Sequence, residues 1–380
     1  MSMKNIFLRR LVKILSLALV LVLILGFSQH YYMRDTGNNT VRLRGFYLED
    51  KNTLDVVVLG ASEVYQGFNA CEFYKKTGVT SYPYAYASNP ITFWKYELRE
   101  ILNRQKPKVL VVEINSAGYD DDMLYLGASV RYLTENMRLQ KEKKEIVSIY
   151  GKESFLSYFF PIIKYHDQWT DKKKLKSALT LMRMDLRGHS LLKGAFMHTL
   201  QKPAKQVQKG YDQEAVQELN PNAEKYLREF LDECKDSGIE HILFVRFPHL
   251  MTTKRKVFEL QRQNRAAEII AEYGYDYVNL DAHCEKARVY KPEDFHNADH
   301  LMMDGQIKFT DYLAEFLQKR YNLQPTQLTE VQRKKWKKSM ESMDACYAYY
   351  SDYMKKPNKD VEHVIYEKEN VLNELRKYYK

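Results

Sequence analysis

Residues 55–69 read DVVVLGASEVYQGFN, and this stretch decides the fold. The run LDVVVL at 54–59 is almost continuously apolar, is rich in β-branched residues and is bounded by Gly60. Such a run is typical of a strand buried on both faces of a parallel sheet. Ser62 then follows in a predicted strand-to-helix turn, which exposes a hydroxyl beside free backbone N–H groups. On its own, a serine at this position is more often a helix N-cap.

The same rhythm of strands and helices continues along the chain. Further strands are predicted at 81–87, 109–114, 242–245 and 277–280. Helices are predicted at 68–77, 92–104, 222–237, 255–273 and 305–321. Alternating strands and helices indicate an α/β domain over 54–325, built on a parallel sheet with right-handed crossovers.

Three segments lie outside this rhythm. Residues 33–53 are polar and basic and are predicted to be a linker. Residues 120–222 have helical spacing and are predicted to be a mostly helical insertion. Residues 326–380 are basic, rich in tyrosine and helical, and we expect a pair of helices packed on the domain. A contact surface for a partner or polymer is the alternative for this C-terminal helical extension.

Residues 1–32 are predicted to form a cytoplasmic tip and a transmembrane signal anchor. Residues 11–27 are apolar except for Lys13 and Ser16, and basic residues precede them. The positive-inside rule then predicts a single-pass membrane protein with its N-terminus inside and its main domain extracellular. A cleaved signal peptide is the competing interpretation, but the residues after Phe27 match a cleavage site poorly.

The net charge of +10 and the pI of about 9.0 indicate acidic neighbours. The sequence holds no nucleic-acid-binding motif, so anionic lipids or wall polymers are the expected neighbours, and simple solvated surface charge is the alternative. The four cysteines have no metal-ligand spacing, and we expect free structural thiols. They are Cys71, Cys234, Cys284 and Cys346.

Candidate catalytic residues follow the predicted strands, because open parallel sheets form their sites at the carboxyl ends of the strands. Ser62 is the candidate nucleophile, and His300, in an acid-flanked loop before the last helix, is the candidate general base. Asn115 follows the strand at 109–114 and could donate its amide to an oxyanion. Taken singly, the histidine could be a surface residue and the asparagine a turn residue.

Two residues of the insertion indicate a second role. Trp169 could stack on a sugar ring, and His166 could donate a hydrogen bond to it. The alternative is that both residues anchor the insertion to the core. Glu113, at the end of a buried strand, could be a site acid or could pair with a nearby base.

In the order Ser62, Asn115, His300, the chain resembles the SGNH (GDSL-like) hydrolase superfamily. The first block is DVVVLGASEVYQGFN, and the last is DFHNADHLMMDGQIKFT at 294–310. The resemblance is closest to an exported Gram-positive branch, of which FFPIIKYHDQW at 159–169 is typical. That branch is distantly similar to the lipoteichoic-acid D-alanylation protein and to alginate O-acetylation proteins. The resemblance implies a flavodoxin-like three-layer α/β/α fold, no cofactor and no metal.

The resemblance also implies roles for individual residues. Asn297 stands where the family has the acid that orients the histidine, so Asp294 or Asp299 would have to substitute, or a Ser–His dyad would act alone. The second block reads AYASN at 85–89, where the backbone N–H of Ala87 or Ser88 would join Ser62 and Asn115 in the oxyanion hole.

We therefore expect an extracytoplasmic serine O-acyl esterase or acyltransferase that acts on cell-envelope polysaccharide or teichoic acid. A membrane O-acyltransferase is a possible partner through the same resemblance. The alternative is a catalytically weak or inactive accessory protein that keeps the fold and binds envelope polymer or partner proteins. A third hypothesis is a plain α/β domain that binds a small molecule.

Overall fold

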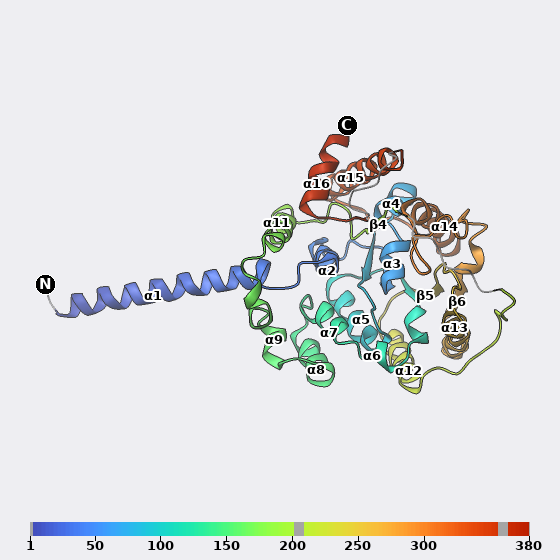
Figure 1. Cartoon of the computed structure of the whole chain (residues 1–380), viewed down its shortest axis with the longest axis horizontal. Coiled ribbons are helices and arrows are strands. Elements are labelled where there is room, and N and C mark those ends of the chain that lie inside the picture. The colour runs from blue at the N-terminus through green and yellow to red at the C-terminus, as the bar shows by residue number, and fades with distance from the viewer. Residues whose placement is uncertain (1–2, 201–208, 356–363, 380) are drawn as a thin grey trace.

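Parallel strands form one sheet in the centre of the molecule, in the order β2-β1-β3-β5-β6 (Figure 1). They are β1 (Val56–Gly60), β2 (Ser81–Ala85), β3 (Val109–Glu113), β5 (His241–Arg246) and β6 (Asp276–Asn279). Each overlaps a strand predicted from the sequence, so the α/β class with a parallel sheet is confirmed. This computed structural model describes residues 3–200, 209–355 and 364–379.

The register of the sheet brings the ends of its strands to a common edge. Leu59 of β1 pairs with Tyr84 of β2 on one side and with Val112 of β3 on the other. Val112 pairs in turn with Phe244 of β5. Because the strands are parallel, the loops after β1, β2, β3 and β5 all leave at the carboxyl edge, where sites form in such sheets.

Helices cover both faces of the sheet. Alternate residues of a strand point to opposite sides, so each face has its own hydrophobic core. Val57 and Leu59 belong to one core, and Val56 and Val58 belong to another. The first core includes residues of α5 (Trp94–Arg104), α12 (Pro221–Lys235) and α13 (Lys254–Glu272). The second includes residues of α3 (Ser62–Gly67), α4 (Ala70–Thr77) and α14 (Met303–Tyr321).

The prediction of a linker over 33–53 is wrong, because this segment contains the buried helix α2 (Asn38–Leu48). Arg42 of α2 is 2% exposed. Its guanidinium carbon lies 3.4 Å from the ring centroid of Tyr65, and the group donates a hydrogen bond to the carbonyl of Ala85 at 3.2 Å. An arginine that the sequence suggests is exposed to solvent is therefore buried, and it binds the helix to the sheet.

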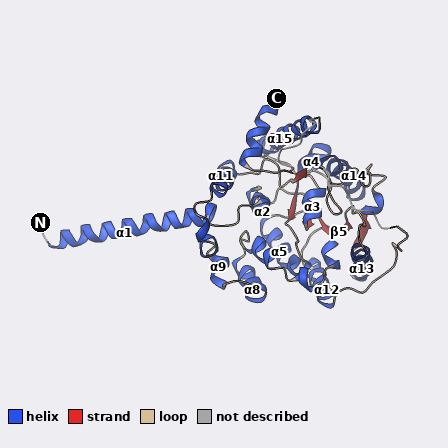
Figure 2. Cartoon of the chain, in the orientation of Figure 1, coloured by secondary structure: helices blue, strands red, loops and turns tan. Residues whose placement is uncertain are grey.

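The insertion between β3 and α12 is mostly helical in its described part (Figure 2). It holds α6 (Asp121–Leu124), α7 (Gly127–Thr134), α8 (Gln140–Tyr150), α9 (Phe155–Phe159), α10 (Ile162–Tyr165) and α11 (Lys172–Arg187). The extension after α14 holds α15 (Glu330–Met354) and α16 (Glu369–Leu375), which agrees with the expected pair of helices. The insertion and the extension meet where β4 (Met197–His198) pairs antiparallel with β7 (Val364–Ile365).

A smaller core joins the C-terminal helices to the domain. It contains Cys71 of α4 together with Met343 and Cys346 of α15. All four cysteines are buried and free, as expected from their spacing. Single-turn helices complete the described structure: η1 (Ser28–Tyr32), η2 (Ile91–Phe93), η3 (Asn115–Gly118), η4 (His166–Gln168), η5 (Leu280–His283) and η6 (Arg376–Tyr378).

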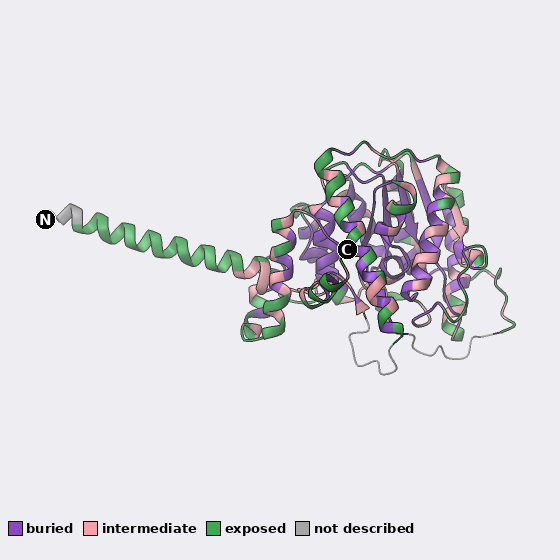
Figure 3. Ribbon diagram, turned by 90° about the horizontal axis from the view of Figure 1, so that it is seen from above, coloured by how far each residue is buried: buried purple, intermediate pink, exposed green. Residues whose placement is uncertain are grey.

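Helix α1 (Met3–Phe27) projects from the domain, and its described surface is exposed (Figure 3). Among the described helices it alone is long and apolar enough to cross a membrane. An N-terminal signal sequence has the same properties. The membrane anchor is thus compatible with the structure, while the side of the membrane on which the domain lies stays a prediction.

Candidate functional site

Ser62 lies at the carboxyl edge of the sheet, as the first residue of α3, one residue after the end of β1. The turn requires glycine at position 60, because a Cβ there would lie 2.6 Å from Cγ2 of Val64 and 3.0 Å from Cβ of Glu113. The Ser62 hydroxyl lies 3.4 Å from Oε2 of Glu63, to which it donates a long hydrogen bond. The expected strand-to-helix turn is therefore present.

Glu63 is the residue on which the site converges. Its side chain is 5% exposed, and Oε1 accepts a hydrogen bond from Nδ2 of Asn115 at 2.7 Å. The same oxygen lies 3.8 Å from Nε2 of His249. Burial raises the pKa of Glu63, but contact with His249 and the charges of His249 and His300 outweigh burial and hold the pKa below its usual range. Glu63 is therefore a buried carboxylate that faces imidazoles.

A chain of hydrogen bonds holds Asn115 in place after β3. Its Oδ1 accepts from Nε2 of Gln263 at 2.8 Å, and Gln263 accepts in turn from Arg246. The backbone N–H of Asn115 donates to both carboxylate oxygens of Glu113 at 3.1 Å. The amide nitrogen Nδ2 carries two hydrogens and gives one to Glu63, so a second can serve an oxyanion.

The pKa values of Glu113 and Glu63 are shifted in opposite directions, although the two carboxyl groups interact. Burial, followed by the negative charge of Glu63, raises the pKa of Glu113 well above its usual range. Glu113 therefore keeps its proton to higher pH than Glu63 does. A pair of carboxyl groups whose environments separate their pKa values in this way is typical of functional sites.

His300 lies in the loop before α14, and Asn297 shapes that loop. Oδ1 of Asn297 accepts from the backbone N–H groups of Asp299 at 2.9 Å and of His300 at 3.1 Å. Nε2 of His300 is buried and has no hydrogen-bond partner among the described residues. Burial lowers the pKa of His300, although the carboxylates of Glu63 and Asp299 act in the opposite direction. Burial therefore favours the neutral imidazole, which is the form able to accept a proton.

The residues predicted to orient this imidazole have other partners in the described structure. Asn297 serves the backbone of its own loop. Asp299 pairs with the ammonium of Lys256 and acts on His300 only through its charge. Asp294 pairs with Lys308 at 2.8 Å, which makes it a structural carboxylate at the start of α14.

Ser62 and His300 are brought to one neighbourhood, although the structure records no hydrogen bond between them. Glu63 follows Ser62 in the chain, and Asp299 precedes His300. The carboxylate oxygens of Glu63 and Asp299 and a ring nitrogen of His249 all lie within 4.8 Å of one another. The two predicted catalytic residues are thus held near each other by the close approach of their sequence neighbours, Glu63 and Asp299.

The second block, AYASN at 85–89, contains two predicted backbone donors to the oxyanion hole. One of them already donates to another group. The N–H of Ala87 donates to Oδ1 of Asn39 at 3.0 Å, which occupies it in this conformation. Ser88 adopts a positive φ of 52°, and its carbonyl accepts from the hydroxyl of Ser129 at 2.8 Å. Ser88 is therefore the remaining candidate from this block for the oxyanion hole.

His249, like Glu63, is a site residue that the sequence analysis missed. It is 4% exposed and lies in the loop after β5, at the same edge as Ser62. Nδ1 lies 2.7 Å from the carbonyl of Phe247, while the buried Nε2 faces Glu63 without a hydrogen-bond partner among the described residues. A histidine four residues after a predicted buried strand was the signal that could have found it.

Glu63, His249 and Asp299 are the described residues that could hold a divalent cation, since carboxylate oxygens and imidazole nitrogens are common metal ligands. Two of these ligands already have partners: Lys256 neutralises Asp299, and Asn115 donates to Glu63. The cluster is thus partly balanced in charge by the protein itself.

His166 and Trp169 are not brought to this site. They lie in and directly after η4, where the carbonyl of Trp169 accepts a hydrogen bond from Tyr32 at the domain end of α1, whereas α3 and α14 lie farther from the anchor (Figure 1). Trp169 is 68% exposed, and Nδ1 of His166 lies 2.9 Å from the carbonyl of Ile163 in its own turn. Their position does not support substrate binding next to Ser62.

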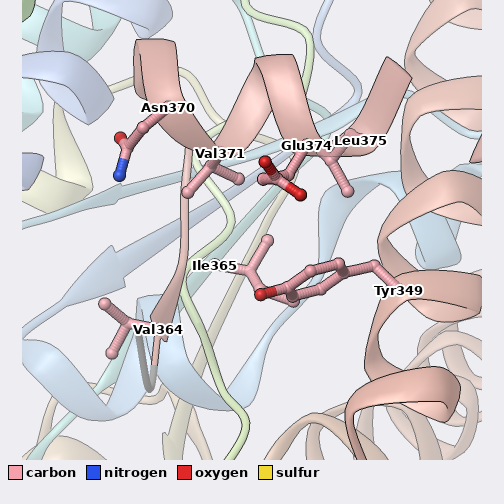
Figure 4. Close-up of a pocket in the computed structure, with 7 residues that line it drawn as sticks. All are labelled: Tyr349, Val364, Ile365, Asn370, Val371, Glu374 and Leu375. Atoms are coloured by element: carbon pink, nitrogen blue, oxygen red, sulfur yellow. The ribbon is translucent and has the colours of Figure 1, made fainter. Parts of the chain in front are cut away.

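A separate apolar pocket lies between the C-terminal elements (Figure 4). Val364 and Ile365 of β7, Val371 and Leu375 of α16, and Tyr349 of α15 line it. Its acid, Glu374, pairs with Lys377 at 2.7 Å. This pocket offers no nucleophile with a neighbouring base, so the carboxyl edge of the sheet remains the candidate site.

No family model matches the chain, and no curated protein matches it. Function is therefore argued from the residues and the geometry of the site.

Proposed function

We propose that this chain is a membrane-anchored extracytoplasmic serine O-acyl esterase or acyltransferase. The observation that carries the proposal is the convergence of the Ser62 turn and the His300 loop on Glu63 at the carboxyl edge of the sheet. A hydroxyl at a helix N-terminus, a buried neutral imidazole and a fixed amide donor are the groups that acyl transfer needs.

The order of the sheet supports a finer description of the fold. Counted within this sheet alone, the strands follow the order 2-1-3-4-5, which is the flavodoxin-like order. With helices on both faces, the domain agrees with the flavodoxin-like three-layer arrangement that the resemblance to SGNH hydrolases implies.

In the proposed reaction, Oγ of Ser62 attacks the acyl carbonyl carbon and its proton passes to Nε2 of His300. The backbone N–H groups of Ser62 and Ser88 and the second amide hydrogen of Asn115 stabilise the oxyanion. The alcohol then leaves with the proton from His300, and an acyl-serine remains. Water or a polymer hydroxyl attacks this ester, giving its proton to His300, which returns it to Ser62.

The proposed substrates are O-acylated cell-envelope polysaccharides or teichoic acids. The net charge of +10 suits an anionic polymer, because positive fields concentrate such substrates. The resemblance also implies a membrane O-acyltransferase as a partner that would supply the acyl group.

A fluorophosphonate probe tests the nucleophile in the full chain, held in detergent or membranes. We expect the probe to label Ser62 and the Ser62→Ala variant to lose the label. Ser116→Ala is the matched control, because Ser116 is a buried serine one residue after Asn115 and should not affect labelling. Labelling that persists in the Ser62→Ala variant would exclude Ser62 as the nucleophile.

A specific observation favours the second candidate function, an accessory protein that binds polymer without chemistry. The Ser62 hydroxyl bonds to Glu63 rather than to His300, and Asp299 is paired with Lys256. A chain that resists the probe but cosediments with purified teichoic acid would support this function over catalysis.

A further inference from the structure

A group of exposed apolar side chains lies in α9, in α10 and in the turns beside them. The group, named here the apolar patch, consists of Phe155, Leu156, Phe160, Ile163 and Trp169. Other exposed large apolar side chains of the described domain, such as Leu186, Phe258 and Val331, are scattered along the chain. In two fully described stretches, 28–148 and 217–257, no large apolar side chain is exposed. The apolar patch is therefore a local feature that requires a partner surface.

Hydrogen bonds join the apolar patch to the domain end of the anchor. Nε2 of Gln29 donates to the carbonyl of Phe159 at 3.4 Å. The hydroxyl of Tyr32 donates to the carbonyl of Trp169 at 2.5 Å. Helices α9 and α11 lie on either side of the base of α1 (Figure 1). The patch and the end of the anchor thus form one unit.

The length of the anchor determines how deep the apolar patch and the domain end of α1 lie in the membrane. The apolar stretch 11–27 is 17 residues long and spans roughly 26 Å as a helix, at 1.5 Å per residue. This is close to the hydrocarbon core of a bilayer, which is about 30 Å thick, and the side chain of Lys13 can reach its edge. Phe27 then lies near the boundary of the core, and Gln29 and Tyr32 lie among the headgroups, where aromatic side chains are favoured.

We propose that the apolar patch inserts into the headgroup region of the leaflet nearest the domain and forms a second membrane contact beside α1. Two contacts fix the orientation of the domain, whereas a single helix would leave it free to tilt. The exposed Lys172 and Lys173 follow Trp169 and favour anionic lipid. The inference rests on the anchor spanning the membrane, not on chemistry at Ser62, so each proposal can fail alone.

The tryptophans of the full chain provide a direct test. Trp94 is fully buried, Trp336 is 3% exposed, and the anchor contains no tryptophan, so only Trp169 can meet lipid. The full chain is reconstituted at one copy per nanodisc, in anionic lipid with or without bromine at the upper part of the acyl chains. We expect brominated lipid to quench the part of the emission that the Trp169→Phe variant lacks.

A paired set of variants tests the rest of the patch. The double variant Leu156→Ser, Phe160→Ser should reduce quenching of Trp169, whereas Val331→Ser, which changes an exposed apolar residue of α15, should not. Emission from Trp169 that ignores bromine would overturn the proposal. So would emission that shifts with protein concentration in detergent, because a second copy would then cover the patch.

Discussion

The side-chain amide of Asn115 donates to Oε1 of Glu63 at 2.7 Å, and this contact joins the end of β3 to the first turn of α3. One amide hydrogen is thereby committed to orienting the side chain, while the other is free to act on a substrate. The contact gives Glu63 a positioning role beside the nucleophile that does not require it to touch substrate.

The Asn115→Ala variant should lower the turnover of activated acyl esters about 10²-fold or more, as the loss of one oxyanion donor does in other acyl-transfer enzymes. The decrease should fall on kcat, because the donor acts on charge that develops in the transition state. Gln263→Ala is the matched control, since it removes a partner of Asn115 and keeps the amide donor. Equal losses in the two variants would show that Asn115 acts only through the packing of the network.

The acid limb of the pH–rate profile should lie below pH 6.5, because burial lowers the pKa of His300 from that ordinary value. A base with a lowered pKa stays neutral at lower pH, and it therefore remains able to accept a proton there. Glu63 acts in the opposite direction, so the Glu63→Gln variant should move the acid limb to still lower pH. Profiles of kcat/KM for the two proteins check this, and an unmoved limb would separate His300 from the observed ionisation.

The strands could be predicted from the sequence because each is a short apolar run, which a strand buried on both faces requires. Helix α2 could not, since Arg42 and Arg44 make its sequence look like a solvated linker. In the structure Arg42 lies over Tyr65, and Arg44 pairs with Asp185 of α11, which lies far away in the sequence. No local pattern reports such tertiary partners.

For the site, sequence reasoning placed Ser62, Asn115 and His300 at one edge but did not identify what connects them. Glu63 and His249 make the connection, and both carry signals that are ambiguous before the loops are assembled. A glutamate in the first turn of a helix is common because it complements the helix dipole. The buried position that gives Glu63 its role exists only once β3 lies beside β1 and β5 lies beside β3.

Glu97 should make stability fall as pH rises. It is fully buried, accepts hydrogen bonds from Tyr86 at 2.6 Å and Asn89 at 2.8 Å, and burial raises its pKa from 4.5 to about 8. Between these two values the folded chain keeps a proton that the unfolded chain has lost, so stability present at low pH is lost as pH rises through about 8.

The Glu97→Gln variant should remove this dependence, since an amide has no proton to lose. The melting temperature of the full chain in detergent is measured below pH 4.5 and above pH 8. As pH rises, the melting temperature of the variant should increase relative to that of the wild type. Glu229→Gln, at a partly exposed ion pair with Lys95, is the control and should show no such gain. Parallel pH curves for the wild type and the Glu97→Gln variant would contradict the buried-proton account.

The buried ion pair of Lys193 and Glu49 should be costly to break. Nζ of Lys193 lies 2.8 Å from both carboxylate oxygens, and the two side chains are 0% and 4% exposed. The same ammonium lies 4.4 Å from the ring centroid of Trp336, so the pair joins the end of α2, the insertion and α15. Removal of one partner leaves the other charge buried and unpaired.

The Lys193→Met variant should therefore lose about 3–5 kcal/mol of stability, the usual loss when one partner of a buried pair is removed. Glu49→Gln should cost less, because the amide oxygen still accepts a hydrogen bond from the Lys193 ammonium, although the ammonium then lacks its counter-charge. The double variant Lys193→Met, Glu49→Leu should recover part of the loss, since an apolar pair can replace a buried ion pair. Denaturant unfolding of the three variants checks this order. If the double variant were the least stable, the pair would matter mainly through its shape and its contact with Trp336 rather than through its charge.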